Sequence, residues 1–246
     1  PPEIGARAEE RLRARRARDW AVADRLKAEI EAAGWKVVDA GTMWSVERAA
    51  PATVHDGERV RYGTAAAVPS RLDDEPVGRA TVVIVADDAT DTGADAAART
   101  AGEVADHAPD GTQVVVVANG IAPDAAAFLL ALDATDPGAP GVVTEVVWTS
   151  GRLGRAAALN AGIRRAAAPV VILLDDRVED GGDVVGPLVA SLDDPAVAVV
   201  GSDGLVTSDL RHFVPAPPGA REVAAIAATA LAFRRADYLT CGPLDE

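Results

Sequence analysis

The chain has 246 residues, a formal net charge of −14 and 49% hydrophobic residues, which suits one large α/β domain or a mid-sized domain with a small appendage. No apolar run reaches the roughly 20 residues of a membrane span, and no signal peptide is recognisable. The single cysteine, Cys241, excludes an internal disulfide and a cysteine-cluster metal site, so we expect a cytoplasmic protein. The bulk acidity disfavours nucleic-acid binding, because phosphate contacts need dense Lys and Arg.

Residues 1–48 are expected to form a small module of their own. Apolar residues at helical spacing predict two helices within residues 3–33, and two short apolar segments within residues 35–46 predict a β-hairpin. Positive and negative side chains nearly balance in this segment, whereas the rest of the chain carries the acidic excess. The aromatic side chains that are expected to form its small core are Trp20, Trp35 and Trp44.

Residues 49–79 contain proline, small residues and scattered charge, and we expect a linker with one strand at residues 58–62. Over residues 80–246, strand and helix patterns alternate. Buried strands are predicted at residues 81–86, 113–118, 142–148, 169–174 and 197–201. Helices are predicted between them, at residues 94–107, 123–132, 153–168 and 183–192. This order predicts right-handed crossovers and an α/β fold with a mostly parallel, doubly wound sheet.

Polar side chains follow the predicted strands at their carboxyl ends, where a sheet of this kind binds its ligands. The clearest signal is the buried strand 170–174, which is followed directly by Asp175 and Asp176. Hard divalent cations prefer carboxylate oxygens and keep positions open for phosphate oxygens, and a bound cation can neutralise a leaving diphosphate. An Asp pair at a strand end can equally cap the next helix or be solvated, and the strand alone leaves both interpretations open.

Several motifs around this acidic pair, in their order and spacing, resemble the inverting glycosyltransferases of family 2, which have the GT-A fold. Leu153-Gly154 leads into an Ala-rich helix that ends in Asn160-Ala161-Gly162-Ile163, and the apolar strand ends in Asp175-Asp176-Arg177-Val178-Glu179. Ala198-Val199-Val200-Gly201 and the box Gly242–Glu246 match later motifs of that family. The resemblance covers residues 80–246 and implies the Rossmann-like fold of nucleotide-diphospho-sugar transferases.

The resemblance implies a single displacement with inversion at a nucleotide-diphosphate sugar that lies across the strand ends. Asp87 or Asp88, together with Asn119, would contact the base or the ribose. Asp176, with or without Mg²⁺ or Mn²⁺, would face the diphosphate, and Asp245 would deprotonate the acceptor hydroxyl. The full set that the resemblance assigns to nucleotide-sugar binding is Asp87, Asp88, Asn119, Gly120, Arg152, Gly154, Asn160, Asp175, Asp176 and Arg177.

Two positions depart from the family's pattern. Arg177 occupies the third position of the acidic cluster, usually an acidic metal ligand, and Ala118 replaces an acid at the end of the second strand. Because Arg177 cannot coordinate a cation, three alternatives remain: transfer that depends on a metal held by Asp176, metal-independent transfer in which Arg177 pairs with the diphosphate, and a domain that lost the reaction. In the family, further helices follow the box Gly242–Glu246, so we expect this chain to be truncated there.

Residues 4–46 are similar to the C-terminal piece of cysteinyl-tRNA synthetases, in the segment Arg15–Leu26, at Gly34 and in Asp39–Trp44. The sequence signatures and zinc ligands of aminoacylation do not occur in the chain, which excludes that activity. The arginines of the first helix indicate either contact with RNA or a solvated face, and their near-neutral surroundings favour the solvated face. The alternative function is therefore a non-catalytic GT-A-like binding protein with a synthetase-derived appendage.

Overall fold

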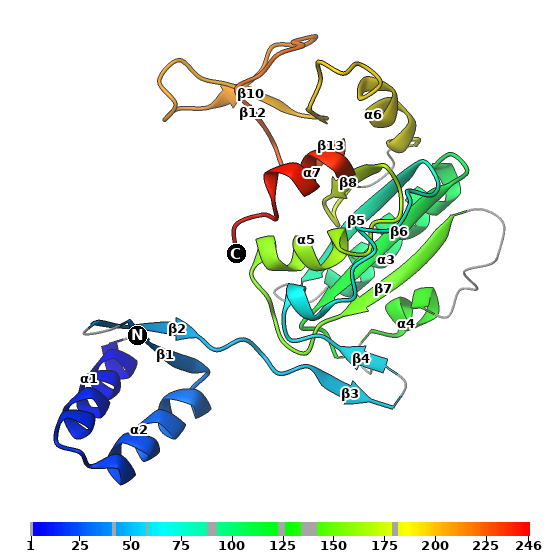
Figure 1. The fold of residues 1–246 in the computed structure, drawn as a ribbon. Helices are drawn as coiled ribbons and strands as arrows, with labels where there is room; N and C mark the ends of the chain where they lie inside the picture. The colour runs from blue at the N-terminus through cyan, green and yellow to red at the C-terminus, as the bar shows by residue number, and fades with distance from the viewer. Residues whose placement is uncertain are drawn as a thin grey trace. The chain divides into compact units, whose positions relative to one another are not determined.

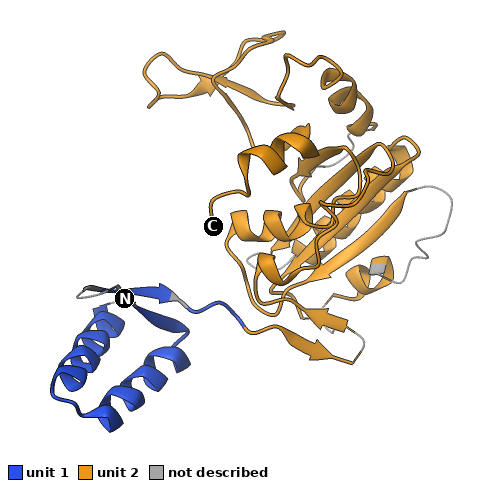
Figure 2. Cartoon of the chain, viewed as in Figure 1, with its two compact units in different colours: residues 1–51 blue, residues 52–246 orange. Residues whose placement is uncertain are grey.

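The computed structural model describes residues 2–40, 43–57, 59–87, 93–122, 126–133, 142–178 and 182–246. The chain forms two compact units, Pro1–Pro51 and Ala52–Glu246 (Figures 1 and 2). Each unit has buried apolar residues of its own that pack together. No helix in these described segments combines the length and the hydropathy that a bilayer crossing requires.

The first unit is a helical hairpin followed by a β-hairpin, as its apolar spacing predicts. Ile4, Ala8 and Ile30 form its buried core, and Trp35 and Trp44 pack against them. The helices are α1 (Pro2–Arg16) and α2 (Trp20–Ala32), and the antiparallel strands are β1 (Trp35–Ala40) and β2 (Met43–Arg48).

Trp20 does not join this core, because its residue is 57% exposed. It is the first residue of α2, and the helical rotation places it about 90° away from the stripe of buried side chains. That stripe consists of Ala23, Leu26 and Ile30. The expectation of a core built from three tryptophans is therefore wrong for Trp20 and correct for the other two.

The second unit is built on a six-stranded, mostly parallel sheet with strand order β7-β6-β5-β8-β13-β9 (Figure 1). The four strands from β7 to β8 run parallel, and β13 is antiparallel to both of its neighbours. The strand bounds are β5 (Ala80–Asp87), β6 (Thr112–Asn119), β7 (Val143–Trp148), β8 (Val170–Leu174), β9 (Val199–Gly201) and β13 (Ala230–Arg234). The predicted strands are confirmed, whereas β13 was not predicted.

Helices cover both faces of the sheet. Successive side chains of a strand point to opposite faces, and here both faces carry apolar side chains that the helices bury. Val82 and Ile84 of β5 belong to one buried cluster, and Val83 belongs to the other. The first cluster includes residues of α3 (Gly93–His107), α4 (Ala127–Asp133) and α6 (Val185–Ser191). The second includes or contacts residues of α5 (Arg155–Ile163), the short helix η1 (Ala65–Ala67) and α7 (Arg235–Cys241).

Helix α5 ends at Ile163, whereas the sequence pattern predicts a helix that continues to Ala168. The backbone of the intervening segment is bound by the sheet instead. Ala167 N–H donates to Gln113 Oε1 at 3.0 Å, and Ala168 N–H donates to Thr81 Oγ1 at 3.2 Å. Pro169 also disfavours a helical conformation at the residue before it.

Residues 52–79, where we expected a linker, pack onto the second unit. They form the antiparallel strands β3 (Val54–Asp56) and β4 (Arg59–Arg61), followed by η1. Tyr62 extends this hairpin onto the end of β7, because its N–H donates to Trp148 O at 2.8 Å and its carbonyl accepts the Ser150 N–H at 2.9 Å. Val68 is fully buried in the sheet-facing cluster of α5. The strand expected at residues 58–62 corresponds to β4.

A small separate sheet follows β9 in the chain. Its strands are β10 (Gly204–Val206), β11 (Val214–Pro215) and β12 (Ala225–Ile226), in the order β11-β10-β12. The chain then returns to the main sheet as β13. The acidic pair at the end of β8 therefore lies beside a strand that is more than fifty residues later in the sequence.

Candidate functional site

The carboxylates of Asp175 and Asp176 lie where the fully buried strand β8 ends. The Asp175 N–H donates to the carbonyl of Thr229, just before β13, at 2.9 Å, which fixes the strand end. The Asp175 and Asp176 side chains are only 15% and 17% exposed, whereas the Arg177 side chain is 81% exposed. The strand therefore ends in two largely buried carboxylates and one solvent-accessible guanidinium group.

Arg177 folds back onto Asp175. Its Nε and Nη2 donate to Oδ1 and Oδ2 of Asp175 at 3.0 and 3.4 Å, and its backbone N–H donates to Oδ1 at 3.1 Å. Nη2 of Arg155, the first residue of α5, lies 3.8 Å from Asp175 Oδ2. Burial raises the pKa of Asp175, but the hydrogen bonds and charge of Arg177 and the charge of Arg155 outweigh it and lower this pKa below its ordinary value. Asp175 is thus ionised and already engaged by two guanidinium groups.

Asp176 is less well compensated than its neighbour. Burial and the Asp175 charge raise the pKa of Asp176, and the charge of Arg177, whose Nε lies 3.9 Å from Asp176 Oδ1, offsets only part of this. The Thr100 hydroxyl of α3 donates to the Asp176 carbonyl at 2.9 Å and anchors the backbone there. Of the two carboxylates, Asp176 is therefore the one whose surroundings favour a further positive charge.

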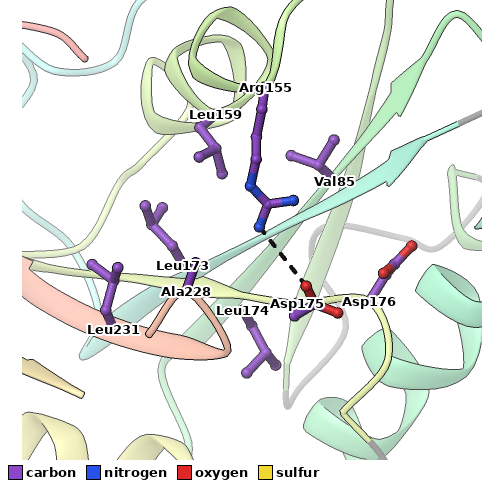
Figure 3. A pocket seen from close by; sticks show the side chains of 9 residues that line it. All are labelled: Val85, Arg155, Leu159, Leu173, Leu174, Asp175, Asp176, Ala228 and Leu231. Atoms are coloured by element: carbon purple, nitrogen blue, oxygen red, sulfur yellow. Dashed lines mark ion pairs between the residues drawn. The ribbon is translucent and has the colours of Figure 1, made fainter. Parts of the chain in front are cut away.

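A small cavity opens at this strand end, between α5, β8 and the segment before and within β13 (Figure 3). Arg155 and Leu159 of α5 line it, together with Asp175, Asp176 and Leu231. Figure 3 shows the Arg155–Asp175 ion pair reaching across it. The centres of water-sized spheres can occupy about 40 Å³ of it, and one water molecule needs only roughly 10–15 Å³ on that measure. It therefore has room for a water molecule or a cation beside the carboxylates.

Asp87, the last residue of β5, is paired with Arg152 of the loop before α5. Arg152 Nε lies 2.7 Å from Asp87 Oδ1, and Nη2 donates to Oδ2 at 3.0 Å, so the contact is bidentate. The two side chains are 57% and 36% exposed, which leaves the pair accessible to a ligand. Both residues were predicted site residues, and the structure brings them together. The predicted alternative, Asp88, lies outside the described residues.

Gly120 allows the Arg152 backbone to approach the end of β6 closely. Its φ is +79°, and a β-carbon at this position would lie 2.8 Å from the Arg152 nitrogen. Its N–H donates to the hydroxyl of the fully buried Thr149 at 2.7 Å. Glycine is required here both by its conformation and by this contact. Thr149 stands at a strand end in the sequence but was not assigned to the site.

Asn119, predicted to contact the nucleotide, instead holds the loop that carries Arg152. Its residue is completely buried. Its Nδ2 donates to Leu153 O at 3.1 Å, and its Oδ1 accepts the Leu153 N–H at 2.8 Å. The carboxamide is therefore engaged at both ends by one backbone residue. The residue that follows, Gly154, is the N-cap of α5 and supplies no side-chain cap, so the first turn of that helix keeps uncapped N–H groups that favour an anion.

Asn160, also predicted to contact the nucleotide sugar, is buried in α5 and joined to the box Gly242–Glu246. Its Nδ2 donates to Leu244 O at 2.8 Å and to Glu246 Oε1 at 2.9 Å. Its Oδ1 accepts the Leu244 N–H and the Tyr238 hydroxyl, each at 3.0 Å. The predicted base, Asp245, lies in this box and is exposed. Tyr238 was not predicted as part of the site, and no sequence motif marks it.

The oxygen donors decide whether a divalent cation fits this site. Within the described segments, no three His, Cys, Asp or Glu side chains gather into a metal-binding group. Asp175 is engaged by Arg177 and Arg155, and position 177 offers a guanidinium group instead of a third carboxylate. Asp176 remains as one carboxylate donor, which fits Mg²⁺ or Mn²⁺ when phosphate and water supply the other ligands.

The mostly parallel sheet, covered on both faces and carrying acidic side chains at its strand ends, defines an α/β protein with the GT-A fold. Residues 81–218 match the family described as glycosyl transferase family 2, and this chain belongs to that family. No curated protein matches the chain.

One solved structure supports the fold, and a second is similar to part of the chain. The mannosyltransferase PcManGT from Pyrobaculum calidifontis, in complex with GDP-Man and Mn²⁺, is 18% identical with a TM-score of 0.51, over 72% of this chain and 50% of that chain. TarS 1–349 of S. aureus is 14% identical with a TM-score of 0.46, over 66% of this chain and 49% of that chain. The chain thus spans about half the length of these two structures.

Proposed function

We propose that this protein transfers a glycosyl group from a nucleotide-diphosphate sugar to an acceptor hydroxyl, with inversion at the anomeric carbon. The observation that carries the proposal is the cluster at the end of β8, where Asp175, Asp176 and Arg155 line one cavity and Arg177 pairs with Asp175. Membership of glycosyl transferase family 2 supports the assignment of this cluster to the donor.

The guanidinium groups of Arg177 and Arg155 would receive the diphosphate. Arg177 is anchored to Asp175 through Nε and Nη2 but remains 81% exposed, so it keeps N–H donors for phosphate oxygens. Negative charge grows on the diphosphate as its bond to the anomeric carbon breaks, and fixed guanidinium charges stabilise that state. A divalent cation, held by Asp176 and the phosphate oxygens, would add Lewis-acid neutralisation of the same charge.

The nucleoside would lie toward the ends of β5 and β6. The Asp87–Arg152 pair is accessible there, and it offers a carboxylate for ribose hydroxyls and a planar guanidinium for the base. Asn119 and Gly120 would act indirectly, because they hold the loop that carries Arg152. This division of roles replaces direct contact of Asn119 with the nucleotide.

Asp245 would accept the proton of the acceptor hydroxyl. The hydroxyl oxygen then forms a bond to the anomeric carbon from the side opposite the diphosphate. The bond between that carbon and the diphosphate oxygen breaks, and the electron pair leaves with the nucleoside diphosphate. The exposure of Asp245, beside the buried residue Asn160 of α5, supports this role.

A second candidate is a nucleotide-binding protein without transferase activity. The observation that favours it is the Arg177–Asp175 ion pair, which puts a cation in a cluster that the family pattern makes wholly acidic. In that case the module of residues 4–46, with its resemblance to a synthetase appendage and its exposed Trp20, would provide a contact to RNA or protein. The near balance of charge in that module keeps RNA the less favoured of these partners.

Thermal unfolding of the full chain in the presence of UDP, GDP, CDP or ADP, and of their common sugar conjugates, tests both candidates. We expect one nucleoside diphosphate to raise the midpoint by about 5–10 °C at a concentration about 100 times its Kd. The doubly substituted protein Arg155→Ala/Arg177→Ala should lose this shift, while Arg211→Ala, an exposed arginine of the β10–β11 connection, should retain it.

Release of nucleoside diphosphate from the conjugate that binds, with water as acceptor, then separates the candidates. Transferase chemistry predicts slow release that Asp245→Asn abolishes. Binding without any release supports the second candidate. No shift with any nucleotide, with and without Mn²⁺, would overturn both.

A further inference from the structure

We infer that Asn160 is a positioning residue for the proposed base Asp245 and makes no contact with the nucleotide sugar. The inference rests on the proposed function, because it takes Asp245 as the base. Asn160 is 2% exposed, and four hydrogen bonds of 2.8–3.0 Å surround its carboxamide. A carboxamide has two N–H donors and two acceptor lone pairs. All four are used within the protein, so no hydrogen-bonding capacity is left for a ligand.

These bonds hold the residues on both sides of Asp245. Leu244, the residue before it, is held at its N–H and at its carbonyl by the same carboxamide. Glu246, the residue after it, is held through its carboxylate. The box begins at Gly242, whose φ of +90° turns the chain away from the end of α7. Asp245 is thus an exposed residue of a short segment, and both of its neighbours are tied to one buried side chain.

Tyr238 of α7 sets the orientation of the Asn160 carboxamide. Its hydroxyl donates to Oδ1, which leaves Nδ2 to face Leu244 O and Glu246. Its ring is stacked on Phe233 of β13, with centroids 6.1 Å apart. Burial raises the pKa of Tyr238, which keeps the hydroxyl protonated and able to donate.

Helix α5 links this segment to the cavity at the end of β8. Arg155 and Leu159 line the cavity, and Asn160 is the next residue along the same helix. The helix itself is pressed onto the sheet, since a β-carbon on Gly162 would lie 2.4 Å from Val83 Cγ1. One rigid helix therefore sets the separation between the leaving diphosphate and the base. Asn160 transmits that position to Asp245.

The substitution Asn160→Asp tests the inference with little change of shape. It keeps both acceptor contacts, removes both N–H donors and places a carboxylate against Glu246. Amide hydrogen exchange of residues 242–246, followed by mass spectrometry, should accelerate on the order of tenfold or more, because two hydrogen bonds are lost. The kcat for release of the nucleoside diphosphate should fall at least about tenfold. The KM of the sugar conjugate should stay within about twofold of the wild-type value, and so should the Kd of the nucleoside diphosphate.

Tyr238→Phe and Thr240→Ala are the matched comparisons on α7. Tyr238→Phe removes one hydrogen bond to Asn160 and should give an intermediate loss of kcat at constant KM. The Thr240 hydroxyl donates to Ala236 O within the helix, outside this network, and its removal should leave exchange and kcat unchanged. If Asn160→Asp does not fold, Tyr238→Phe and Glu246→Gln carry the same test, since each alters one bond of the network.

The outcomes separate this inference from the proposed function. Unchanged exchange in Asn160→Asp, or a raised KM with kcat retained, would overturn the positioning role and make Asn160 a ligand contact or a packing residue. Failure of the wild type to bind any nucleotide would overturn the proposed function and the role of Asp245 in it. In that event, faster exchange would still establish that Asn160 holds the box Gly242–Glu246.

Discussion

Arg177 and Asp175 close a tight ring within three residues of chain: the Nε and the backbone N–H of Arg177 donate to the same oxygen, Oδ1 of Asp175, at 3.0 and 3.1 Å. The positive charge at the strand end therefore comes from the loop itself. With a third carboxylate at position 177, the positive charge would instead come from a metal cation bound from solution. This difference makes the cation dependence of the site a property that one substitution can change.

Arg177→Asp should make nucleotide binding depend on Mn²⁺. The substitution removes a guanidinium group and adds an oxygen donor beside Asp176, and the affinity of a site for hard cations rises with the charge of its ligands. We expect Mn²⁺ to bind at least about tenfold more tightly than in the wild type, by isothermal titration calorimetry in the presence of nucleoside diphosphate. Arg177→Gln, which removes the charge without adding a carboxylate, is the control. Equal Mn²⁺ affinity in the two variants would contradict the prediction.

Arg177→Ala should lower stability in a pH-dependent way. The pKa of Asp175 lies below its ordinary value of 3.8 in the folded protein, so the carboxylate stabilises the fold above that pH and the contribution is lost as pH falls through the folded pKa. The pKa of Asp176 is raised, so its charge opposes folding near neutral pH until it is protonated on acidification. Without Arg177 the pKa of Asp175 rises, and the pKa of Asp176 rises further.

The loss of stability should therefore be largest near neutral pH and shrink below about pH 4. Urea unfolding at several pH values in metal-free buffer measures it, with carboxyl ¹³C chemical shifts reporting the two pKa values. Arg221→Ala, which removes an exposed arginine of the connection between β11 and β12, should give a pH-independent effect. A loss of stability in Arg177→Ala that stays the same at every pH would show that the ion pair does not set these pKa values.

Gly120→Ala should destabilise the second unit more than Gly219→Ala. The two glycines have nearly the same φ, +79° and +80°, but only Gly120 faces another backbone, with Arg152 N at 2.8 Å from the added carbon. Gly219→Ala should cost about 1–2 kcal/mol for the left-handed conformation alone. Gly120→Ala should cost about 1–3 kcal/mol beyond that, because the backbone must shift. Denaturant unfolding measures both, and equal losses would mean that the loop moves without penalty.

Two helical glycines should respond to alanine in opposite directions. Gly102 of α3 has no atom within 4 Å of an added β-carbon, whereas Gly162 of α5 has Val83 Cγ1 at 2.4 Å and Val117 Cγ2 at 3.0 Å. Gly102→Ala should stabilise the protein by about 0.5–1 kcal/mol through helix propensity. Gly162→Ala should destabilise it by about 1–3 kcal/mol through overpacking. Stabilisation by both substitutions would mean that α5 is not pressed against the sheet.

The sequence was sufficient to predict features that a local pattern encodes. Buried strands such as β5 and β8 are runs of β-branched and aliphatic residues, and a parallel sheet brings their carboxyl ends, with Asp87 and Asp175, to one edge. The end of α5 could not be predicted, because the sheet binds the backbone at Ala167 and Ala168 through side chains distant in sequence.

Roles that depend on distant partners could not be predicted either. Asn119 and Asn160 have the residue type that a sugar or ribose contact requires, and both were assigned to the ligand. In the structure their carboxamides hydrogen-bond to the backbones of Leu153 and Leu244 instead. Arg155 and Tyr238 gain their places only through tertiary packing. Nothing in the segment Ala230–Arg234 marks it as the antiparallel neighbour of β8.

That late strand has a consequence for the order in which the protein is made. Strand β8 leaves the ribosome well before β13, and until Arg234 follows, one edge of β8 has its backbone groups and apolar side chains unpaired. An open hydrophobic edge of this kind is a template for pairing with other chains. The segment 81–218, which matches the family, lacks this closing strand. Expressed alone, it would have an incomplete sheet prone to aggregate, whereas a fragment that extends through Arg234 carries the strand that seals it.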